Sequence, residues 1–345
     1  MPFGGASAPR LDGGEHGGDL AAARRLFPAA AEPFVDLSTG INPNPYPLPR
    51  LQPEIFARLP DSAALERVCA AAAKAYGAPS PACVVPAPGS QILLPLICGL
   101  VRPGRAAILM PTYSEHARAA ALAGHAVAEV GDLGAIGDAD LVVVTNPNNP
   151  DGRLFAKSAL LALAERLEGH GGVLVVDEAF MDVVPRGASL ASDVVPGNVV
   201  VLRSFGKFFG LAGLRLGFAL AAPPLAARLS ARLGPWAVSG PALEVGAAAL
   251  ADHDWIEKTR HRLATAAARL DAILSDAGLD VVGGTTLFRL TRTPAARALF
   301  QHLGNAGILT RIFSDHPEWL RFGLPAAEPD WERLRIAVAE FRGGR

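Results

Sequence analysis

Four short segments of this 345-residue chain combine side chains that can do chemistry with the small or rigid residues that shape tight turns. In chain order they are Gly89-Ser90-Gln91, Asn146 to Gly152, Asp177-Glu178-Ala179-Phe180, and Ser204 to Gly217. Each follows a predicted strand, and ligands of open α/β sheets bind at the carboxyl ends of the strands. We therefore expect the four segments to meet at one edge of a sheet.

Lys207 is the one lysine in a run of small and apolar residues between Ser204 and Arg215. Desolvation in such surroundings lowers the pKa of an amine and makes it a usable Schiff-base nucleophile. A solvated loop lysine is the alternative interpretation. The neighbouring glycines, with Ser204 on one side and Arg215 on the other, favour the reactive one.

Two further segments suggest charge recognition. Asp177 ends an apolar run over residues 173–176, so its carboxylate needs a cationic partner, unless it only caps a turn or a helix. Gly89-Ser90-Gln91 is predicted to open a helix, whose first backbone N–H groups form an anion site. Arg215 carries a planar fork that suits phosphate oxygens, although an ordinary surface charge is the alternative.

The elements around these segments predict an α/β fold. Short β-branched runs alternate with alanine-rich helical patterns, which is typical of a mostly parallel sheet. The predicted strands cover residues 84–86, 106–110, 126–130, 141–145, 173–176, 199–203 and 216–220, with helices at 114–124 and 158–170.

After Ser239 the pattern changes to long helices over residues 242–253 and 255–277, which lead to a smaller unit. In that unit we predict strands at 286–291, 308–313 and 320–324, a helix at 294–306, and a final helix with Trp331, Leu334, Val338 and Phe341 on one face. The first fifty residues fit no regular element. The predicted division is an N-terminal arm and active-site loop over 1–50, a large domain over 51–250 and a small domain over 251–345.

Composition excludes several classes of function. With 32 basic and 33 acidic residues, the chain has no electrostatic footprint for nucleic acid or an anionic membrane. Cys69, Cys83 and Cys98 form no pair with metal-ligand spacing and favour buried thiols in a reducing cytoplasm over disulfides or zinc. We expect no metal. No secretory signal is expected in residues 1–18, and the patterns of P-loops, dinucleotide sites, serine hydrolases and zinc hydrolases fail.

Together the four segments resemble the pyridoxal-phosphate enzymes of the aminotransferase fold (fold type I, class I/II). The nearest branch holds histidinol-phosphate aminotransferases and threonine-phosphate decarboxylases. The run from Ser204 to Gly217 is the most specific part, and the likeness covers nearly the whole chain. It implies a three-layer, mostly parallel sheet in a large cofactor domain, a smaller α+β domain, and a homodimer.

The resemblance also implies roles for single residues. Lys207 holds the cofactor covalently, and Asp177 pairs with its protonated ring nitrogen. The remaining cofactor-binding residues are Gly89, Ser90 and Gln91 with Ser204 and Arg215 at the phosphate, Asn149 at the phenolic oxygen, and Tyr113 on the ring face. The Asn149–Pro150 bond is expected to be cis. A plain Asn-Pro loop and a core or surface tyrosine are the alternatives for the last two residues.

For the substrate, the resemblance implies that Arg321 binds an acid group and that Arg311 contacts the substrate phosphate. It also implies that His16 helps bind that phosphate and that the loop near Asn42 covers the site. Either arginine could instead form a salt bridge at a rim. Two anion-binding arginines suit L-threonine O-3-phosphate, whose decarboxylation yields (R)-1-amino-2-propanol O-2-phosphate for cobalamin synthesis. Two alternatives stay open: a histidinol-phosphate-type aminotransferase, and a non-enzymatic pyridoxal-phosphate-binding regulatory domain.

Three departures from the family pattern bear on this choice. Phe180 stands where aminotransferases carry a tyrosine that donates to the ring oxygen, which favours the decarboxylase branch. Leu59 stands where relatives often offer a tyrosine to the neighbouring subunit's cofactor, so that hydrogen bond is in doubt. Gly206 replaces a common hydroxyl residue and leaves Ser204 as the hydroxyl of its segment.

Overall fold

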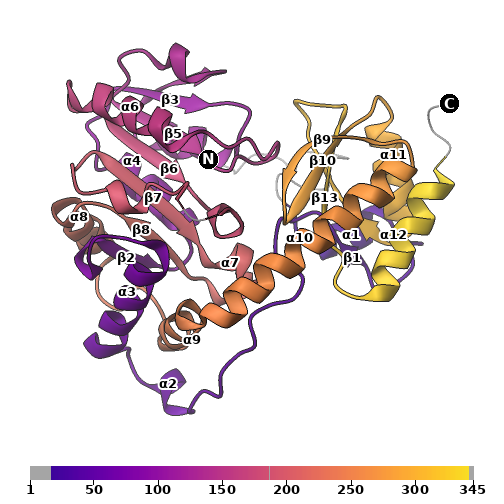
Figure 1. The fold of residues 1–345 in the computed structure, drawn as a ribbon, viewed down its shortest axis with the longest axis horizontal. Helices are drawn as coiled ribbons and strands as arrows, with labels where there is room; N and C mark the ends of the chain where they lie inside the picture. The colour runs from indigo at the N-terminus through magenta and orange to yellow at the C-terminus, as the bar shows by residue number, and fades with distance from the viewer. Residues whose placement is uncertain (1–16, 186, 342–345) are drawn as a thin grey trace, which may run out of the picture. The chain divides into compact units, whose positions relative to one another are not determined.

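The computed structural model describes residues 17–185 and 187–341 (Figure 1). The chain divides into two compact units: unit 1 combines residues up to Pro43 with those from Arg262 onward, and unit 2 runs from Asn44 to His261. The second boundary falls inside the long helix α10 (His253–Asp276). The three-part division predicted above, with boundaries after residues 50 and 250, stays a prediction, and each unit is described by itself.

Unit 2 is built on a seven-stranded sheet in the order β2-β8-β7-β6-β5-β3-β4. β8 pairs antiparallel with both neighbours, and all other pairs are parallel. This confirms the predicted mostly parallel α/β sheet. The strands are β2 (Val84–Ala87), β3 (Arg105–Leu109), β4 (Ala126–Val130), β5 (Leu141–Thr145), β6 (Val173–Asp177), β7 (Val199–Ser204) and β8 (Gly217–Leu220).

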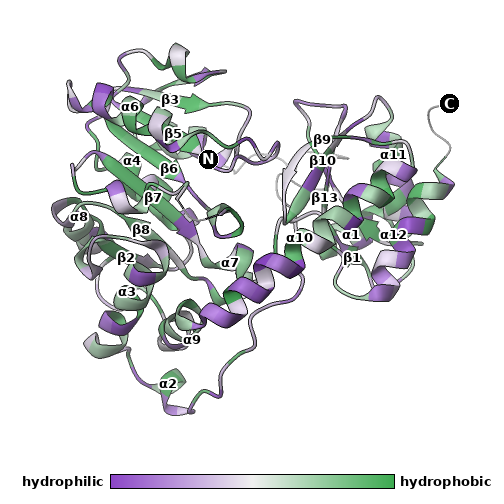
Figure 2. Ribbon diagram, viewed as in Figure 1, coloured by the Kyte–Doolittle hydropathy of each residue, from purple (hydrophilic) through white to green (hydrophobic). Residues whose placement is uncertain are grey.

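The central strands are apolar without alternation because both faces of the sheet are covered. Every residue of β5 and β7 is buried, and successive strand residues point to opposite faces. α4 (Leu93–Cys98), α5 (Glu115–Leu122) and α8 (Pro223–Leu233) share one core cluster with the sheet. α3 (Ser62–Tyr76) and α6 (Lys157–Glu168) contact β2 and β6. Figure 2 shows the hydrophobic strands between these helices.

Local signals fix the helix ends of unit 2. The Asp61 side chain accepts a hydrogen bond from the Ala64 N–H at 2.7 Å and caps α3, which ends at Gly77 with φ 77°. The remaining elements are α2 (Glu54–Ala57), α7 (Phe205–Phe208), α9 (Gly240–Ala251), η1 (Pro81–Cys83), η2 (Ser90–Ile92), η3 (Leu133–Ile136), η4 (Met181–Val183), η5 (Ala191–Asp193) and η6 (Ala212–Leu214). No helix of the described residues is long and apolar enough to cross a membrane.

Unit 1 holds a four-stranded antiparallel sheet in the order β12-β13-β10-β9 and a parallel pair, β1-β11. Its strands are β1 (Val35–Asp36), β9 (Asp280–Thr285), β10 (Phe288–Arg292), β11 (Ile308–Leu309), β12 (Arg311–Ile312) and β13 (Trp319–Gly323). Its helices are α1 (Leu20–Leu26), α11 (Ala296–Asn305), α12 (Glu328–Glu340) and the part of α10 from Arg262. On α12, Trp331, Leu334 and Val338 are buried as predicted, whereas Phe341 follows the helix.

Two predictions for unit 1 are wrong. The first fifty residues do form regular elements: the Asp19 side chain caps α1, and β1 pairs with β11. The single strand predicted over residues 308–313 is two strands, because the chain changes its partner at Thr310, from β1 on one side to β13 on the other. Both features depend on partners far away in the sequence, which periodicity cannot reveal.

Candidate active site

The predicted site residues of unit 2 lie where strands end. Asp177 is the last residue of β6 and Ser204 the last of β7, while Asn146 follows β5 and Gly89 lies two residues beyond β2. β2, β5, β6 and β7 all run in one direction, because β8 is antiparallel to both β2 and β7. The four segments therefore reach the same edge of the sheet, as predicted.

Asp177 is buried, with 8% of the residue exposed, and two neighbours contact its carboxylate. Its Oδ1 accepts from the Ala179 N–H at 3.0 Å, and its Oδ2 lies 3.2 Å from Nε2 of His116, whose side chain is fully buried. The same nitrogen lies 3.1 Å from the Thr145 hydroxyl. Because a carboxylate oxygen accepts hydrogen bonds, we assign a proton to Nε2 of His116, which faces Asp177, while Nδ1 has no hydrogen-bond partner among the described residues.

A chain of polar contacts extends from His116 to the neighbouring strand ends. The hydroxyls of Thr145 and Thr112 lie 2.8 Å apart, and the Thr112 hydroxyl donates to Oδ1 of Asn148 at 2.9 Å. The Asn148 amide in turn donates to the Pro111 carbonyl at 2.7 Å. The ends of β3, β5 and β6 are thereby joined by side chains beyond the point where their backbone ladders stop.

The Asn-Pro segment after β5 is anchored by its backbone. The Asn146 N–H donates to the Asp177 carbonyl at 2.8 Å, and the Phe155 N–H donates to the Asn146 side chain. The Asn146–Pro147 and Asn149–Pro150 bonds are both cis, and the second was predicted. Asn149 is half-buried, and its contact with a cofactor oxygen stays a prediction.

Gly89, Ser90, Ser204 and Arg215 come together in a tight cradle. A Cβ at Gly89, where φ is 89°, would lie 2.6 Å from Nη2 of Arg215. At Gly217, which pairs with Ser204 across β7 and β8, a Cβ would lie 2.3 Å from the Ser90 nitrogen. Two glycines thus let a guanidinium, a helix-opening N–H and a hydroxyl-bearing strand end approach one another. These donors fit a phosphate group.

Lys207 lies in α7, which starts directly after Ser204, and its surroundings are aromatic. Its Nζ is 5.7 Å from the ring centroid of Phe180, which is 4% exposed. The rings of Phe205 and Phe209 stack at 4.3 Å beside it in the sequence. The Lys207 amine therefore lies near an aromatic ring face, and its role as a nucleophile stays a prediction.

Gln91 and Tyr113 are engaged with α5. The Gln91 amide donates to the Glu115 carboxylate at 3.1 Å, and Arg118 binds the same carboxylate. The Tyr113 ring lies edge-on to His116, with centroids 5.6 Å apart. Contacts of Gln91 and Tyr113 with a cofactor stay predictions.

Arg311 and Arg321 lie opposite each other on β12 and β13 of unit 1. Arg321 is 7% exposed, donates to the Ser38 carbonyl at 2.7 Å, and has its guanidinium 5.1 Å from the Phe288 ring centroid. Burial, together with the charge of Arg311, lowers the pKa of Arg321 to about 9, and Asp36 opposes this shift. Two arginines at paired positions, one of them buried, offer several N–H donors and positive charge, which suit the binding of anions.

Three other residues were named from the sequence. Asn42, also of unit 1, is 2% exposed, and Leu59 of unit 2 is 67% exposed. His16 lies outside the described residues.

Sequence reasoning missed His116, Thr112 and Thr145. A signal existed: His116 follows Tyr113 by three residues, at the start of α5, and Thr145 ends a strand whose next segment was already singled out. A buried set of charges around Arg203 was missed as well.

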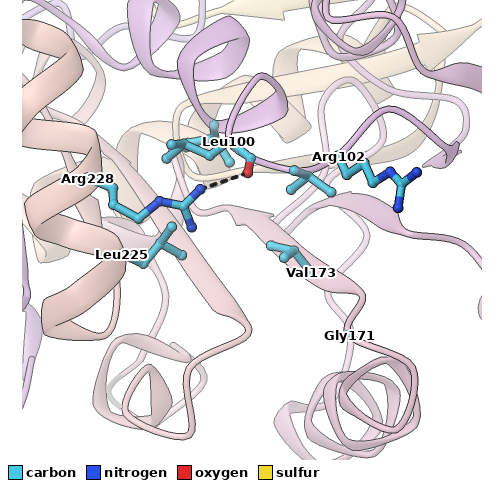
Figure 3. Close-up of a pocket in the computed structure, with 8 residues that line it drawn as sticks. Leu100, Arg102, Gly171, Val173, Leu225 and Arg228 are labelled. Atoms are coloured by element: carbon cyan, nitrogen blue, oxygen red, sulfur yellow. Dashed lines mark hydrogen bonds between the residues drawn. The ribbon is translucent and has the colours of Figure 1, made fainter.

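Unit 2 also contains a cavity of about 200 Å³ between the end of α4, α8 and the turn that precedes β6 (Figure 3). Arg102 and Arg228 lie beside an apolar lining, and Arg228 donates to the Leu100 carbonyl at 3.1 Å. The turn at Gly171 leads into β6, so the cavity borders the edge where that strand begins. It is therefore separate from the strand ends that carry Asp177 and Ser204.

The fold and the site together define the class of protein. Residues 32–340 match the family model described as aminotransferase class I and II, and the chain belongs to this family. One similar relative is the threonine-phosphate decarboxylase of Pseudomonas aeruginosa, which is 44% identical, with 95% of this chain and 98% of that protein covered. Another is the threonine-phosphate decarboxylase of a Sinorhizobium species, which is 43% identical, with 94% of this chain and 98% of that protein covered. Among solved structures, histidinol-phosphate aminotransferase of Sinorhizobium meliloti in complex with pyridoxal-5'-phosphate is similar with a TM-score of 0.80, at 24% identity and 93% coverage of each chain.

Proposed function

We propose that this chain is a pyridoxal-phosphate-dependent decarboxylase of L-threonine O-3-phosphate that forms (R)-1-amino-2-propanol O-2-phosphate. The observation that carries the proposal is the 44% identity to a threonine-phosphate decarboxylase over 95% of the chain. The donors gathered at Gly89 and Arg215, and the Asp177 carboxylate in contact with His116, agree with the cofactor. The product would serve as a building block for the nucleotide loop of cobalamin.

Each proposed role uses a group of this chain. Ser90, Ser204 and Arg215 hold the cofactor phosphate by backbone, hydroxyl and guanidinium donors. Asp177 would bind the protonated ring nitrogen, and His116 orients that carboxylate. The chemistry that pyridoxal phosphate supplies when bound is withdrawal of the electron pair left on the substrate's α-carbon when carbon dioxide departs.

The Lys207 amine would hold the cofactor and be displaced by the substrate amine. Lys207 or a water would then supply the proton that takes the place of carbon dioxide on the α-carbon. Arg311 and Arg321 bind the substrate phosphate and acid group. Phe180, having no hydroxyl, leaves the ring oxygen to Asn149 and favours decarboxylation over transamination.

The direct test is product analysis with the purified protein and pyridoxal phosphate. We expect carbon dioxide release from L-threonine O-3-phosphate, with K207A inactive and K74A, an ordinary helix lysine, unchanged. Conversion of histidinol phosphate with 2-oxoglutarate, without carbon dioxide release, would instead support the aminotransferase. A protein that binds the cofactor but acts on neither substrate would support a regulatory domain. A homodimer and a cytoplasmic location remain part of the proposal.

A further inference from the structure

Close to the candidate site, unit 2 buries three ionisable side chains that the proposed mechanism does not use. Glu178 is 0% exposed, Arg203 4% and Asp182 7%, and we call these three residues the buried charge cluster. Glu178 immediately follows Asp177, and Arg203 immediately precedes Ser204. Both therefore neighbour residues proposed to bind the cofactor.

The cluster begins where the backbone ladder between β6 and β7 ends. Asp177 pairs with Leu202, and the Glu178 N–H makes a further bond to the Leu202 carbonyl at 3.0 Å. One residue further along β7, Nε of Arg203 lies 3.4 Å from the Glu178 carboxylate. Because successive strand residues point to opposite faces, Arg203 lies on the face away from Ser204. The Arg203–Glu178 ion pair therefore links β6 and β7 just beyond their last backbone hydrogen bonds.

Arg203 also reaches the turn that follows β6. Its Nη1 lies 3.4 Å from Oδ1 of Asp182 in η4, the element that starts after Phe180. Arg260 of α10 donates to the Asp182 carbonyl at 2.7 Å, and its guanidinium lies 5.9 Å from the ring of Phe208, the neighbour of Lys207. Contacts of the cluster therefore reach the elements that carry Asp177, Phe180 and Lys207.

Glu178 also accepts two hydrogen bonds from the segment that precedes η5. It accepts from the Ser189 hydroxyl at 2.6 Å and from the Leu190 N–H at 2.8 Å. The Arg203 guanidinium lies 4.5 Å from the ring centroid of Tyr76 in α3. These contacts leave Glu178 and Arg203 little freedom to change conformation without moving the strand ends.

Burying the charged groups of this cluster costs desolvation free energy. Replacing a buried ion pair by well-packed apolar side chains is often neutral or stabilising, so stability alone gives it a weak explanation. The hydrogen bonding is also incomplete, since Nε of Arg203, Oδ2 of Asp182 and the Tyr76 hydroxyl lack hydrogen-bond partners among the described residues. What a guanidinium adds over an apolar side chain is a fixed positive charge close to both carboxylates, with one hydrogen bond to Asp182.

We propose that Arg203 is a positioning residue: by binding Glu178 and Asp182 together, it fixes the ends of β6 and β7 and so sets where Asp177 stands relative to Ser204 and Lys207. The inference rests on the proposed function, because it assigns the cofactor to those three residues. Arg203 itself touches neither cofactor nor substrate in this proposal.

The test compares R203K and E178Q with R67K and E244Q, which change the exposed Arg67–Glu244 pair of the same unit. R203M is avoided because it would leave two buried carboxylates without their cation. For each protein we would measure the dissociation constant of pyridoxal phosphate, the visible circular dichroism per bound cofactor, kcat and KM, and the melting temperature.

We expect R203K and E178Q to bind pyridoxal phosphate about tenfold more weakly. Their circular dichroism per bound cofactor should fall, and kcat should fall by about 10²-fold with little change in KM, as for a misplaced group. R67K and E244Q should match the wild type. A lower melting temperature with unchanged cofactor affinity and unchanged circular dichroism would overturn the inference, as would equal losses in the control pair.

If R203K does not fold, E178Q decides alone, because its amide keeps the size of the glutamate and can still bind Ser189. Failure of the proposed function looks different: the wild-type chain would bind no pyridoxal phosphate or release no carbon dioxide, before any variant is compared. Wild-type binding and turnover with unaltered variants would overturn only the positioning role.

Discussion

Nε2 of His116 faces the Asp177 carboxylate at 3.2 Å from a fully buried side chain, and the same nitrogen meets the Thr145 hydroxyl. Two strand ends and one helix thus converge on a single carboxylate. Both oxygens of the Asp177 carboxylate are held by neighbours, one by the Ala179 N–H and the other by His116. A carboxylate fixed in this way is oriented to bind a cation.

His116→Phe keeps an aromatic ring but removes the N–H that faces Asp177. A lost hydrogen bond to a buried charged group costs about 1.5–3 kcal/mol, so we expect pyridoxal phosphate to bind at least about tenfold more weakly. Titration followed by the visible absorption of the bound cofactor measures this. His170→Phe, at a histidine bonded to the Ala139 carbonyl, is the matched control. Equal affinities for H116F and wild type would contradict the role of His116.

Gly89→Ala tests the phosphate cradle. The new Cβ would lie 2.6 Å from the Arg215 guanidinium, at a backbone φ of 89° that alanine adopts with strain. We expect pyridoxal phosphate affinity to fall about tenfold or more, because the cost of the left-handed conformation and of a displaced charged donor add up to about 2 kcal/mol. Gly131→Ala, with no atom within 4 Å of its Cβ position, should change little.

Arg311→Lys and Arg321→Lys separate the two proposed anion contacts. A lysine keeps the charge but loses the paired donors of the guanidinium. We expect R311K to lower kcat/KM for threonine phosphate about tenfold more than for threonine, which lacks the phosphate. R321K should harm both substrates alike. An equal loss for both substrates at R311K would refute its phosphate role.

The pH dependence of KM follows from Arg321, whose pKa is lowered to about 9 by burial and by Arg311. The charged form that binds an anion is complete below this pKa and is lost above it, so KM for threonine phosphate should rise by up to about tenfold per pH unit beyond it. Since Asp36 raises the pKa of Arg321, D36N should move the rise to lower pH. Steady-state kinetics at about pH 7–10 checks both. A rise at the same pH in D36N would contradict this assignment.

Much of unit 2 could be predicted from the sequence because its strands are local apolar runs bounded by turn residues. The predicted strands at 126–130 and 141–145 coincide with β4 and β5, and the other five differ by one residue at one or both ends. The four polar segments were found for the same reason, since each follows such a run directly. Strand direction alone then brings their ends to one edge.

What the sequence could not predict depends on contacts between distant residues. β1 is two residues long and exists because Ile308 and Leu309 pair with it. His116 looks like any helical histidine until α5 packs beside β6, and Arg203 looks like a polar interruption of an apolar strand until Glu178 and Asp182 surround it. Such roles need the tertiary structure.

The composition of unit 1 from both parts of the chain has a consequence for biosynthesis. During translation, the contiguous unit 2 can fold as soon as its last residues leave the ribosome, since domains generally fold as units in the order of synthesis. Val35 and Asp36 cannot pair until Ile308 and Leu309 have been made. The early residues of unit 1 therefore wait for the end of synthesis, so a ribosome that stops soon after His261 releases a chain whose first strand has no partner to join.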